Sequence, residues 1–101
     1  MPGSERPAFS VMMTDEAVYG CADVEPERVF RRVGELMGAL SMWPYYGQAY
    51  EPAYEAAAPA VPCRVFYCGA YGVYYTVDEE RRLVTVLAVE DERRDPTKRF
   101  S

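Results

Sequence analysis

The sequence contains no histidine and only three cysteines, which limits the chemistry that the chain can perform. Histidine is the side chain that most often transfers protons near neutral pH. Cys63 and Cys68 form a closely spaced pair, but neither a histidine nor a second pair completes a zinc-binding set. We therefore expect no structural metal and no cofactor, and we interpret the cysteines as buried free thiols.

Long apolar runs are also missing. No stretch approaches the roughly 20 apolar residues that a membrane-spanning helix requires. Residues 1–7 are polar and include two prolines, so they lack the apolar core of a signal peptide. The odd number of cysteines fits a reducing compartment. These features predict a cytoplasmic protein that does not contact a membrane.

Positive charge is scarce, and the formal net charge is −5. Residues 1–63 carry four basic and nine acidic side chains, whereas residues 64–101 carry seven of each. Proteins gain most of their affinity for nucleic acids by neutralising phosphates with Lys and Arg. The charge therefore argues against RNA or DNA as a tightly bound general partner.

The remaining composition suits one small globular domain, because the chain has 101 residues and 50% of them are hydrophobic. We expect this domain to span residues 8–96, between a disordered tip at 1–7 and a tail at 97–101. It begins with a short strand at Phe9–Met13. Thr14 then provides the N-cap of a short helix, which has acidic residues in its first turn and ends near residue 22.

A second, amphipathic helix is predicted next. Asp23 can cap it, and Pro26 falls in its first turn, where the missing N–H has no cost. The helix should end near Met42, because Pro44 disfavours helical geometry at the residue before it. Phe30 widens the apolar stripe of this helix. The stripe consists of Val29, Val33, Leu36, Met37 and Leu40.

Residues 44–62 are rich in proline and tyrosine, which predicts an irregular connection. Its tyrosines could stack on a partner's side chains or on bases, or they could cover the edge of the core with their hydroxyls outward.

Three strands are predicted after this connection, at Arg64–Tyr67, Tyr71–Val77 and Leu83–Val89. Gly69 suits the first central position of a type II′ turn between the first two. The last strand is apolar on both faces except at Thr85, which places it in the middle of a sheet. The expected fold class is therefore α+β, with a short N-terminal strand, an α-helical hairpin and a three-stranded antiparallel meander.

An ordered set of residues runs through these strands and just beyond them. The set consists of Arg64, Tyr71, Tyr75, Asp78, Arg94 and Asp95. A Pro-x-x-Gly turn at residues 44–47 precedes it. The order and spacing resemble the RelE/ParE superfamily of bacterial type II toxin–antitoxin systems. That resemblance implies a RelE/ParE-like fold over the domain.

The resemblance also implies one of two activities. RelE-like members cut messenger RNA on the ribosome, whereas ParE-like members inhibit DNA gyrase and have no known catalytic residues. The positions at which the RNA-cutting members carry cations hold Cys63, Val65, Gly72 and Glu92 in this chain. The loss of one preorganised charge can raise a reaction barrier by about 3 kcal/mol. The chain is therefore more similar to the ParE-like branch, and we expect no catalytic residue.

Five residues are candidates for contact with a target or an antitoxin: Arg64, Tyr71, Tyr75, Arg94 and Asp95. The competing interpretation is structural. The two tyrosines share one face of a strand and would pack at the edge of the core, and the arginines would pair with nearby acids such as Asp78 or Glu80 for Arg64.

Three functions are open on this basis. The first is a ParE-like toxin component that acts by protein–protein contact on a target such as DNA gyrase and is neutralised by a cognate antitoxin. The second is a non-toxic, diverged binding protein on the same fold, favoured by the acidic charge and the short first helix. The third is a degenerate RelE-like mRNA endoribonuclease. A homodimer is compatible with apolar surface that an absent antitoxin would leave exposed.

Overall fold

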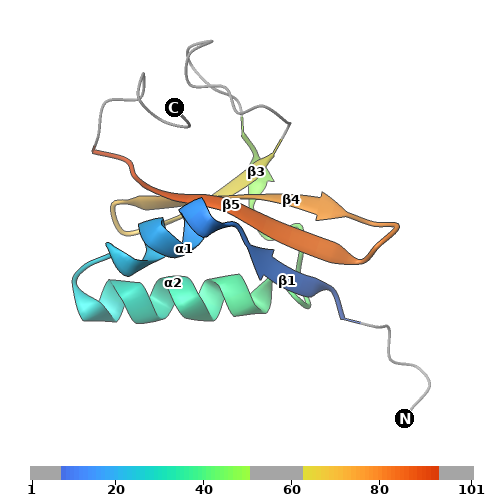
Figure 1. Ribbon diagram of the computed structural model, residues 1–101, viewed down its shortest axis with the longest axis horizontal. Helices are drawn as coiled ribbons and strands as arrows, with labels where there is room; N and C mark the ends of the chain where they lie inside the picture. Colours follow the sequence, from blue (N-terminus) through green and yellow to red (C-terminus); the bar gives the residue numbers. More distant parts are fainter. Residues whose placement is uncertain (1–7, 51–62, 94–101) are drawn as a thin grey trace.

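The computed structural model describes residues 8–50 and 63–93 and shows two helices packed on one face of a five-stranded sheet (Figure 1). The helices are α1 (Asp15–Ala22) and α2 (Glu27–Ala39). The strands are β1 (Ser10–Met13), β2 (Gln48–Ala49), β3 (Arg64–Cys68), β4 (Tyr71–Asp78) and β5 (Leu83–Asp91). The predicted tip at 1–7 and tail at 97–101 lie outside the described residues.

The strands follow the order β1-β5-β4-β3-β2 across the sheet. The predicted antiparallel meander is confirmed as β3, β4 and β5, with Gly69 at a φ of 61° in the first turn. The predicted central position of β5 is also confirmed, because β1 pairs with it in parallel. The expected connection at 44–62 was wrong in one respect: residues 48 and 49 form β2, which pairs antiparallel with β3. Residues 51–62 lie outside the described part of the chain.

The start of α1 is bound to β5 by its predicted cap. The Thr14 hydroxyl accepts a hydrogen bond from the Ala17 backbone N–H at 3.1 Å and donates one to the Leu87 carbonyl at 2.8 Å. Leu87 is the extra residue of a β-bulge, since its neighbours pair with Tyr74 and Tyr75. The bulge shifts the alternation of β5, so that Val84, Val86 and Val89 all face the main core.

The predicted start and packing of α2 need correction. Asp23 is the C-cap of α1, because its backbone N–H donates to carbonyls in the last turn of that helix. Pro26 is the N-cap of α2 and lies just before its first turn. The helix ends at Ala39 and is followed by turn residues. Phe30 is 42% exposed and lies outside the core, because the row of Val33 and Met37 faces the sheet.

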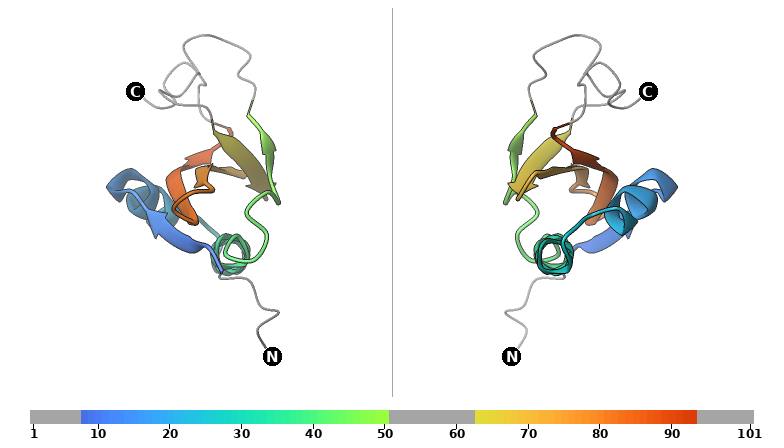
Figure 2. Two further views of the ribbon diagram at one scale, coloured as in Figure 1. Left: turned by 90° about the vertical axis from the view of Figure 1, so that its right-hand side faces the viewer. Right: turned by 90° about the vertical axis from the view of Figure 1, so that its left-hand side faces the viewer.

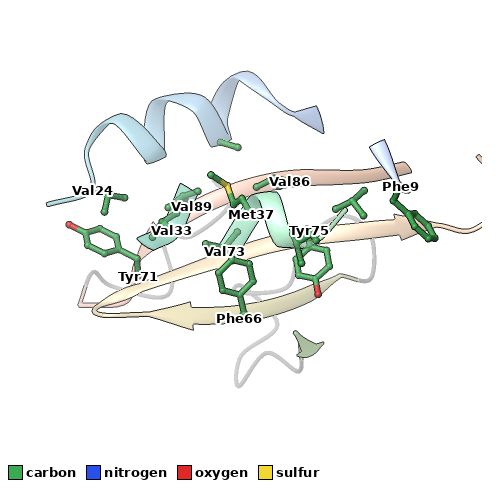
Figure 3. Packing of buried hydrophobic residues seen from close by; sticks show 13 residues of the cluster. Phe9, Val24, Val33, Met37, Phe66, Tyr71, Val73, Tyr75, Val86 and Val89 are labelled. Atoms are coloured by element: carbon green, nitrogen blue, oxygen red, sulfur yellow. The ribbon is translucent and has the colours of Figure 1, made fainter. Parts of the chain in front are cut away.

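The main core lies between the helices and the sheet (Figure 3). Tyr71, Val73 and Tyr75 project from β4 on the helical side and meet Val33 of α2 and Val89 of β5. A smaller cluster of buried residues lies on the other face of the sheet. It consists of Cys63, Val65 and Tyr74. Neither described helix is long and apolar enough to cross a membrane.

Candidate functional site

Arg64 and Tyr75 lie directly opposite each other on β3 and β4. The Tyr75 side chain is fully buried, and its hydroxyl accepts a hydrogen bond from the Gly47 backbone N–H at 2.8 Å. Arg64 donates to the Gly47 carbonyl and, at 3.4 Å, to the Tyr45 carbonyl. Its guanidinium also lies 5.1 Å from the centre of the Tyr45 ring. Together the two residues hold the turn that follows α2 against the sheet.

The expected pairing of Arg64 with an acid was wrong for Asp78. The Asp78 carboxylate lies 3.8 Å from the Arg81 guanidinium in the turn between β4 and β5, so it is engaged locally. Carbonyl oxygens of the preceding turn take its place as acceptors for Arg64. Local spacing did not reveal this arrangement, because the two acceptors are 17 and 19 residues away in the sequence.

Three aromatic side chains on this turn face solvent. Trp43, Tyr45 and Tyr46 are 65%, 49% and 56% exposed. Neighbours hold two of these side chains: the Tyr46 ring packs edge-on against Phe66 at 5.6 Å, and the Tyr45 hydroxyl donates to the Glu79 carboxylate. The hydrogen bond to Glu79 raises the pKa of Tyr45, with smaller contributions from burial and from the carboxylate charge. We call Trp43, Tyr45 and Tyr46 the aromatic turn.

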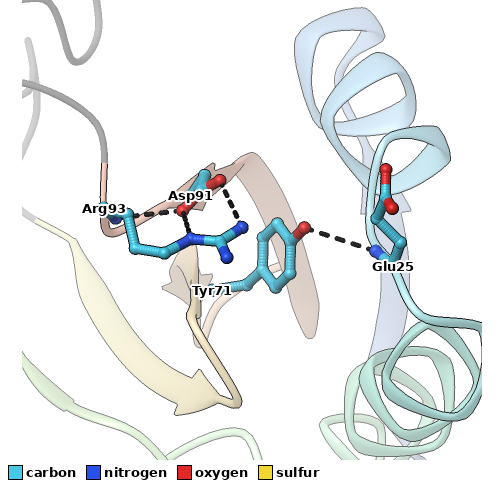
Figure 4. A network of polar contacts seen from close by, with 4 residues as sticks. All are labelled: Glu25, Tyr71, Asp91 and Arg93. Atoms are coloured by element: carbon cyan, nitrogen blue, oxygen red, sulfur yellow. Dashed lines mark hydrogen bonds and ion pairs between the residues drawn. The ribbon is translucent and has the colours of Figure 1, made fainter.

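Tyr71 lies at the opposite end of β4 and belongs to a separate group of contacts (Figure 4). Its hydroxyl accepts a hydrogen bond from the Glu25 backbone N–H at 3.3 Å, which ties the connection between α1 and α2 to the sheet. The Arg93 guanidinium lies 5.8 Å from the centre of the Tyr71 ring. Asp91 holds that guanidinium with two hydrogen bonds of 2.8 and 2.7 Å and raises the pKa of Arg93.

The five candidate residues therefore do not form one site. The structure brings Arg64 and Tyr75 together, places Tyr71 at the other end of the strand, and does not describe Arg94 or Asp95. Arg93, which is not one of the five candidates, lies against the Tyr71 ring. The sequence carried one signal for it, since an acid two residues before an arginine allows a local bidentate pair.

Tyr74 is the centre of a third group, on the face of the sheet away from the helices. Cys63 and Val65 pack against it and are 7% and 1% exposed. The Tyr74 hydroxyl donates to the Glu92 carboxylate at 2.7 Å. Gly72 lies beneath that carboxylate, because a Cβ at this position would be 2.5 Å from a Glu92 oxygen. Burial raises the pKa of the Cys63 thiol, which favours the uncharged form.

This third group contains a phenol, a carboxylate and a neutral thiol. None of the four residues around Tyr74 is positively charged: Cys63, Val65, Gly72 and Glu92. A shallow pocket of about 440 Å³ lies on the same part of the molecule, lined by Gln48, Ala49, Tyr50, Val65 and Tyr67. Within residues 8–50 and 63–93, no group of three or more Cys, Asp or Glu side chains could hold a metal ion.

No protein-family model and no curated protein matches the sequence, but solved structures do match the fold. A chain of the RelBE2 toxin–antitoxin complex from Mycobacterium tuberculosis is 21% identical, with a TM-score of 0.64; the match covers 86% of this chain and 94% of that one. A chain of the RelE–RelB complex from the archaeon Pyrococcus horikoshii is 17% identical, with a TM-score of 0.68 and coverage of 87% and 99%.

The isolated RelE toxin of Escherichia coli is also similar. It is 17% identical, with a TM-score of 0.55 and coverage of 87% of this chain and 88% of that chain. Because this last structure contains the toxin alone, it identifies the shared fold as that of RelE. The chain therefore has the RelE-like α+β fold that the spacing of its strand residues implied.

Proposed function

We propose that this chain is the toxin component of a bacterial type II toxin–antitoxin module. It acts in the cytoplasm by protein–protein contact, in the ParE-like manner, on a target such as DNA gyrase, and a cognate antitoxin neutralises it. Support comes from the fold, which is similar to chains crystallised in toxin–antitoxin complexes from Mycobacterium tuberculosis and Pyrococcus horikoshii.

The arrangement around Tyr74 is the observation that favours a mechanism of protein–protein contact over one of RNA cleavage. The four positions at which RNA-cutting relatives keep cations converge on this one side chain: two pack against it, one lies beside its ring, and one accepts its hydroxyl. Here they hold Cys63, Val65, Gly72 and Glu92. This convergence supports the correspondence of positions on which the proposal relies.

The residues present at these four positions cannot supply what RNA cleavage requires. Attack of a 2′-hydroxyl on the adjacent phosphate builds up negative charge, which needs preorganised cations. Removal of one such group costs roughly 3 kcal/mol of barrier, and here all four are missing. The Glu92 carboxylate adds repulsion towards a phosphate. A mechanism based on contact needs none of these cations.

Among residues 8–50 and 63–93, the aromatic turn is the surface best suited to a protein target. Trp, Tyr and Arg dominate the energetics of protein interfaces when they are held in place. Trp43, Tyr45 and Tyr46 are exposed, and Arg64 and Tyr75 fix the turn from beneath. We assign Arg64 and Tyr75 positioning roles for this surface. Tyr71 is proposed to contribute at the other end of β4, and Arg94 and Asp95, which lie outside the described residues, stay candidates for contact with the target or the antitoxin.

Inducible expression in the native host tests the proposal. The chain alone should arrest growth, and co-expression of the adjacent reading frame should allow growth to resume. Arg64→Ala and Trp43→Ala should relieve the arrest at equal protein levels, because each removes part of the aromatic turn or its support. Arg31→Ala is the matched control, since Arg31 is exposed on α2 and pairs only with Glu27 among the described residues. It should arrest growth like the unmodified chain.

Two in vitro measurements separate the alternatives. The purified chain should inhibit supercoiling by DNA gyrase and should leave messenger RNA on translating ribosomes uncut. New cuts that disappear in Arg64→Ala would overturn the contact mechanism in favour of a RelE-like endoribonuclease. Absence of growth arrest, together with stable binding of the neighbouring gene product, would favour a diverged binding protein without toxicity.

A further inference from the structure

One side of α1 is pressed closely onto β5. Ala17 is fully buried, and Cys21 packs against the main core. Gly20 lies between them in the same row, and a Cβ at this position would be 2.3 Å from the Val89 carbonyl oxygen. The spacing of these three residues defines the inner side of the helix. Rotation of α1 is blocked, so the residues on its other side are held outward.

The outer side of α1 exposes apolar surface. Val18 is 49% exposed, and Tyr19 is 71% exposed, the highest value among the large hydrophobic side chains of the described residues. Figure 2 shows α1 at the margin of the molecule, with the sheet on its inner side. The outer side of a surface helix is usually polar, because its apolar stripe is needed for the core. An exposed tyrosine and valine in adjacent positions depart from that pattern.

Uniform negative charge surrounds these two side chains. Asp15, Glu16 and Asp23 are all exposed, and α1 contains no basic residue. Within residues 8–50 and 63–93, none of the three carboxylates has a hydrogen bond or an ion pair. The charges of α2 differ, since Glu27 pairs with Arg31 at 2.6 Å and Glu35 pairs with Arg32 at 3.2 Å.

We propose that this outer face of α1, formed by Asp15, Glu16, Val18, Tyr19 and Asp23, is a docking surface for a basic amphipathic helix of a partner protein. The apolar side of that helix covers Val18 and Tyr19, and its Lys or Arg side chains pair with the three carboxylates. α1 is roughly 12 Å long, which matches about two turns of a partner helix. The identification of that partner as the antitoxin rests on the proposed function.

Charge complementarity selects this occupant over others. The net charge of the chain is −5, and the apolar pair lies within one of its acidic stretches, so an acidic helix or a second copy of α1 would be repelled. A basic helix gains attraction at encounter and ion pairs at the rim, whereas Tyr19 supplies the amphipathic anchor typical of interface centres.

Two synthetic peptides of about 14 residues test the surface directly. Both carry leucines on one helical face, and the polar face holds lysines in one peptide and glutamates in the other. NMR shifts of the full-length, isotope-labelled chain should change at the amides of α1 with the lysine peptide and remain unchanged with the glutamate peptide. Affinity should fall as salt is raised, because the rim charges become screened.

Variants locate the interaction. Tyr19→Ala should weaken the lysine peptide by about tenfold or more, as expected for the loss of an anchor. Asp15→Asn combined with Glu16→Gln should weaken binding of the lysine peptide and reduce the salt dependence of that binding. Phe30→Ala is the matched control, since Phe30 is an exposed aromatic residue on α2 outside this face. The affinity of this variant for the lysine peptide should be unchanged. Thermal melting of each variant separates weaker binding from loss of fold.

The product of the adjacent reading frame then identifies the partner. Its complex with the chain should be weakened by Tyr19→Ala, while growth arrest by the chain alone persists. If the chain arrests growth but α1 variants leave both the complex and the peptide affinity unchanged, the docking surface is wrong and the proposed function stands. If the lysine peptide binds at α1 in a chain without toxicity, the docking surface stands and the proposed function fails. Equal binding of the two peptides would overturn the charge argument.

Discussion

The hydroxyl of Tyr75 shows how one buried atom positions an exposed surface. It accepts the Gly47 N–H, and Gly47 has no room for a side chain, because a Cβ would lie 2.6 Å from the Val65 carbonyl oxygen. The aromatic turn is therefore fixed against β3 and β4. The sequence predicted that Tyr75 packs in a strand, since alternation gives the face of a side chain. It could not predict the hydroxyl's partner, which is 28 residues away.

Replacement of Tyr75 by phenylalanine should lower the free energy of unfolding by about 1–3 kcal/mol, because the buried Gly47 N–H loses its acceptor. The ring is retained, so little apolar packing is lost. Urea denaturation followed by circular dichroism measures the change.

Tyr46→Phe is the control for this substitution. The Tyr46 side chain is 56% exposed, and its ring, not its hydroxyl, makes the contact with Phe66. Its effect should stay within about 0.5 kcal/mol, as for most surface changes. Equal unfolding free energies for Tyr75→Phe and the unmodified chain would contradict the assigned role of the hydroxyl.

The two helices differ in how far local rules define them. The N-cap rule located α1, and the Thr14 hydroxyl does accept the Ala17 N–H. The same rule misplaced the start of α2, because Asp23 has the right chemistry for a cap but its backbone already completes α1. The helical period identified the buried row of α2, but it also led us to include Phe30 in the apolar stripe, and Phe30 is exposed. Periodicity gives a direction around the axis, whereas the width of the buried stripe depends on the sheet that covers it.

Two glycine substitutions separate helix propensity from helix packing. Gly34→Ala should stabilise the fold by up to about 1 kcal/mol, because nothing lies within 4 Å of the added methyl group and alanine favours the helix. Gly20→Ala should destabilise it, by about 1–3 kcal/mol or more, because the methyl group would collide with the Val89 backbone. Thermal and urea unfolding of both variants provide the comparison, and stabilisation of both would show that α1 is not pressed onto β5.

The order of the whole sheet could not be predicted from local pattern alone. Each strand of the meander follows its neighbour through a short turn, so the sequence predicted that part. The parallel pairing of β1 with β5 joins segments from opposite ends of the described chain, and no turn signals it. β2 escaped prediction because two residues are too few to show alternation. The bulge at Leu87 and the hydrogen bond from Thr14 then lock β1, α1 and β5 together.

This dependence of the sheet on β1 can be tested at a single exposed position. The Ser10 N–H donates to the Arg82 carbonyl just before β5 at 2.8 Å, and the Thr14 N–H donates to the Val86 carbonyl of β5 at 3.0 Å. The N–H of Met12, midway between them, is therefore expected to point towards β5 as well. Met12→Pro removes that backbone donor. The Met12 side chain is 56% exposed, so its replacement leaves little cavity. The free energy of unfolding should fall by roughly 1–3 kcal/mol.

The same variant should also associate, because release of β1 uncovers an edge of β5, whose side chains are apolar on both faces. Light scattering at increasing protein concentration measures this, alongside urea unfolding. Met12→Thr keeps the N–H and favours a strand, so it should remain monodisperse and close to the unmodified stability. If the proline variant matched the threonine variant in both measurements, β1 would be dispensable. The sheet would then be held together by the meander alone, and closure of the two ends of the chain would contribute nothing to the fold.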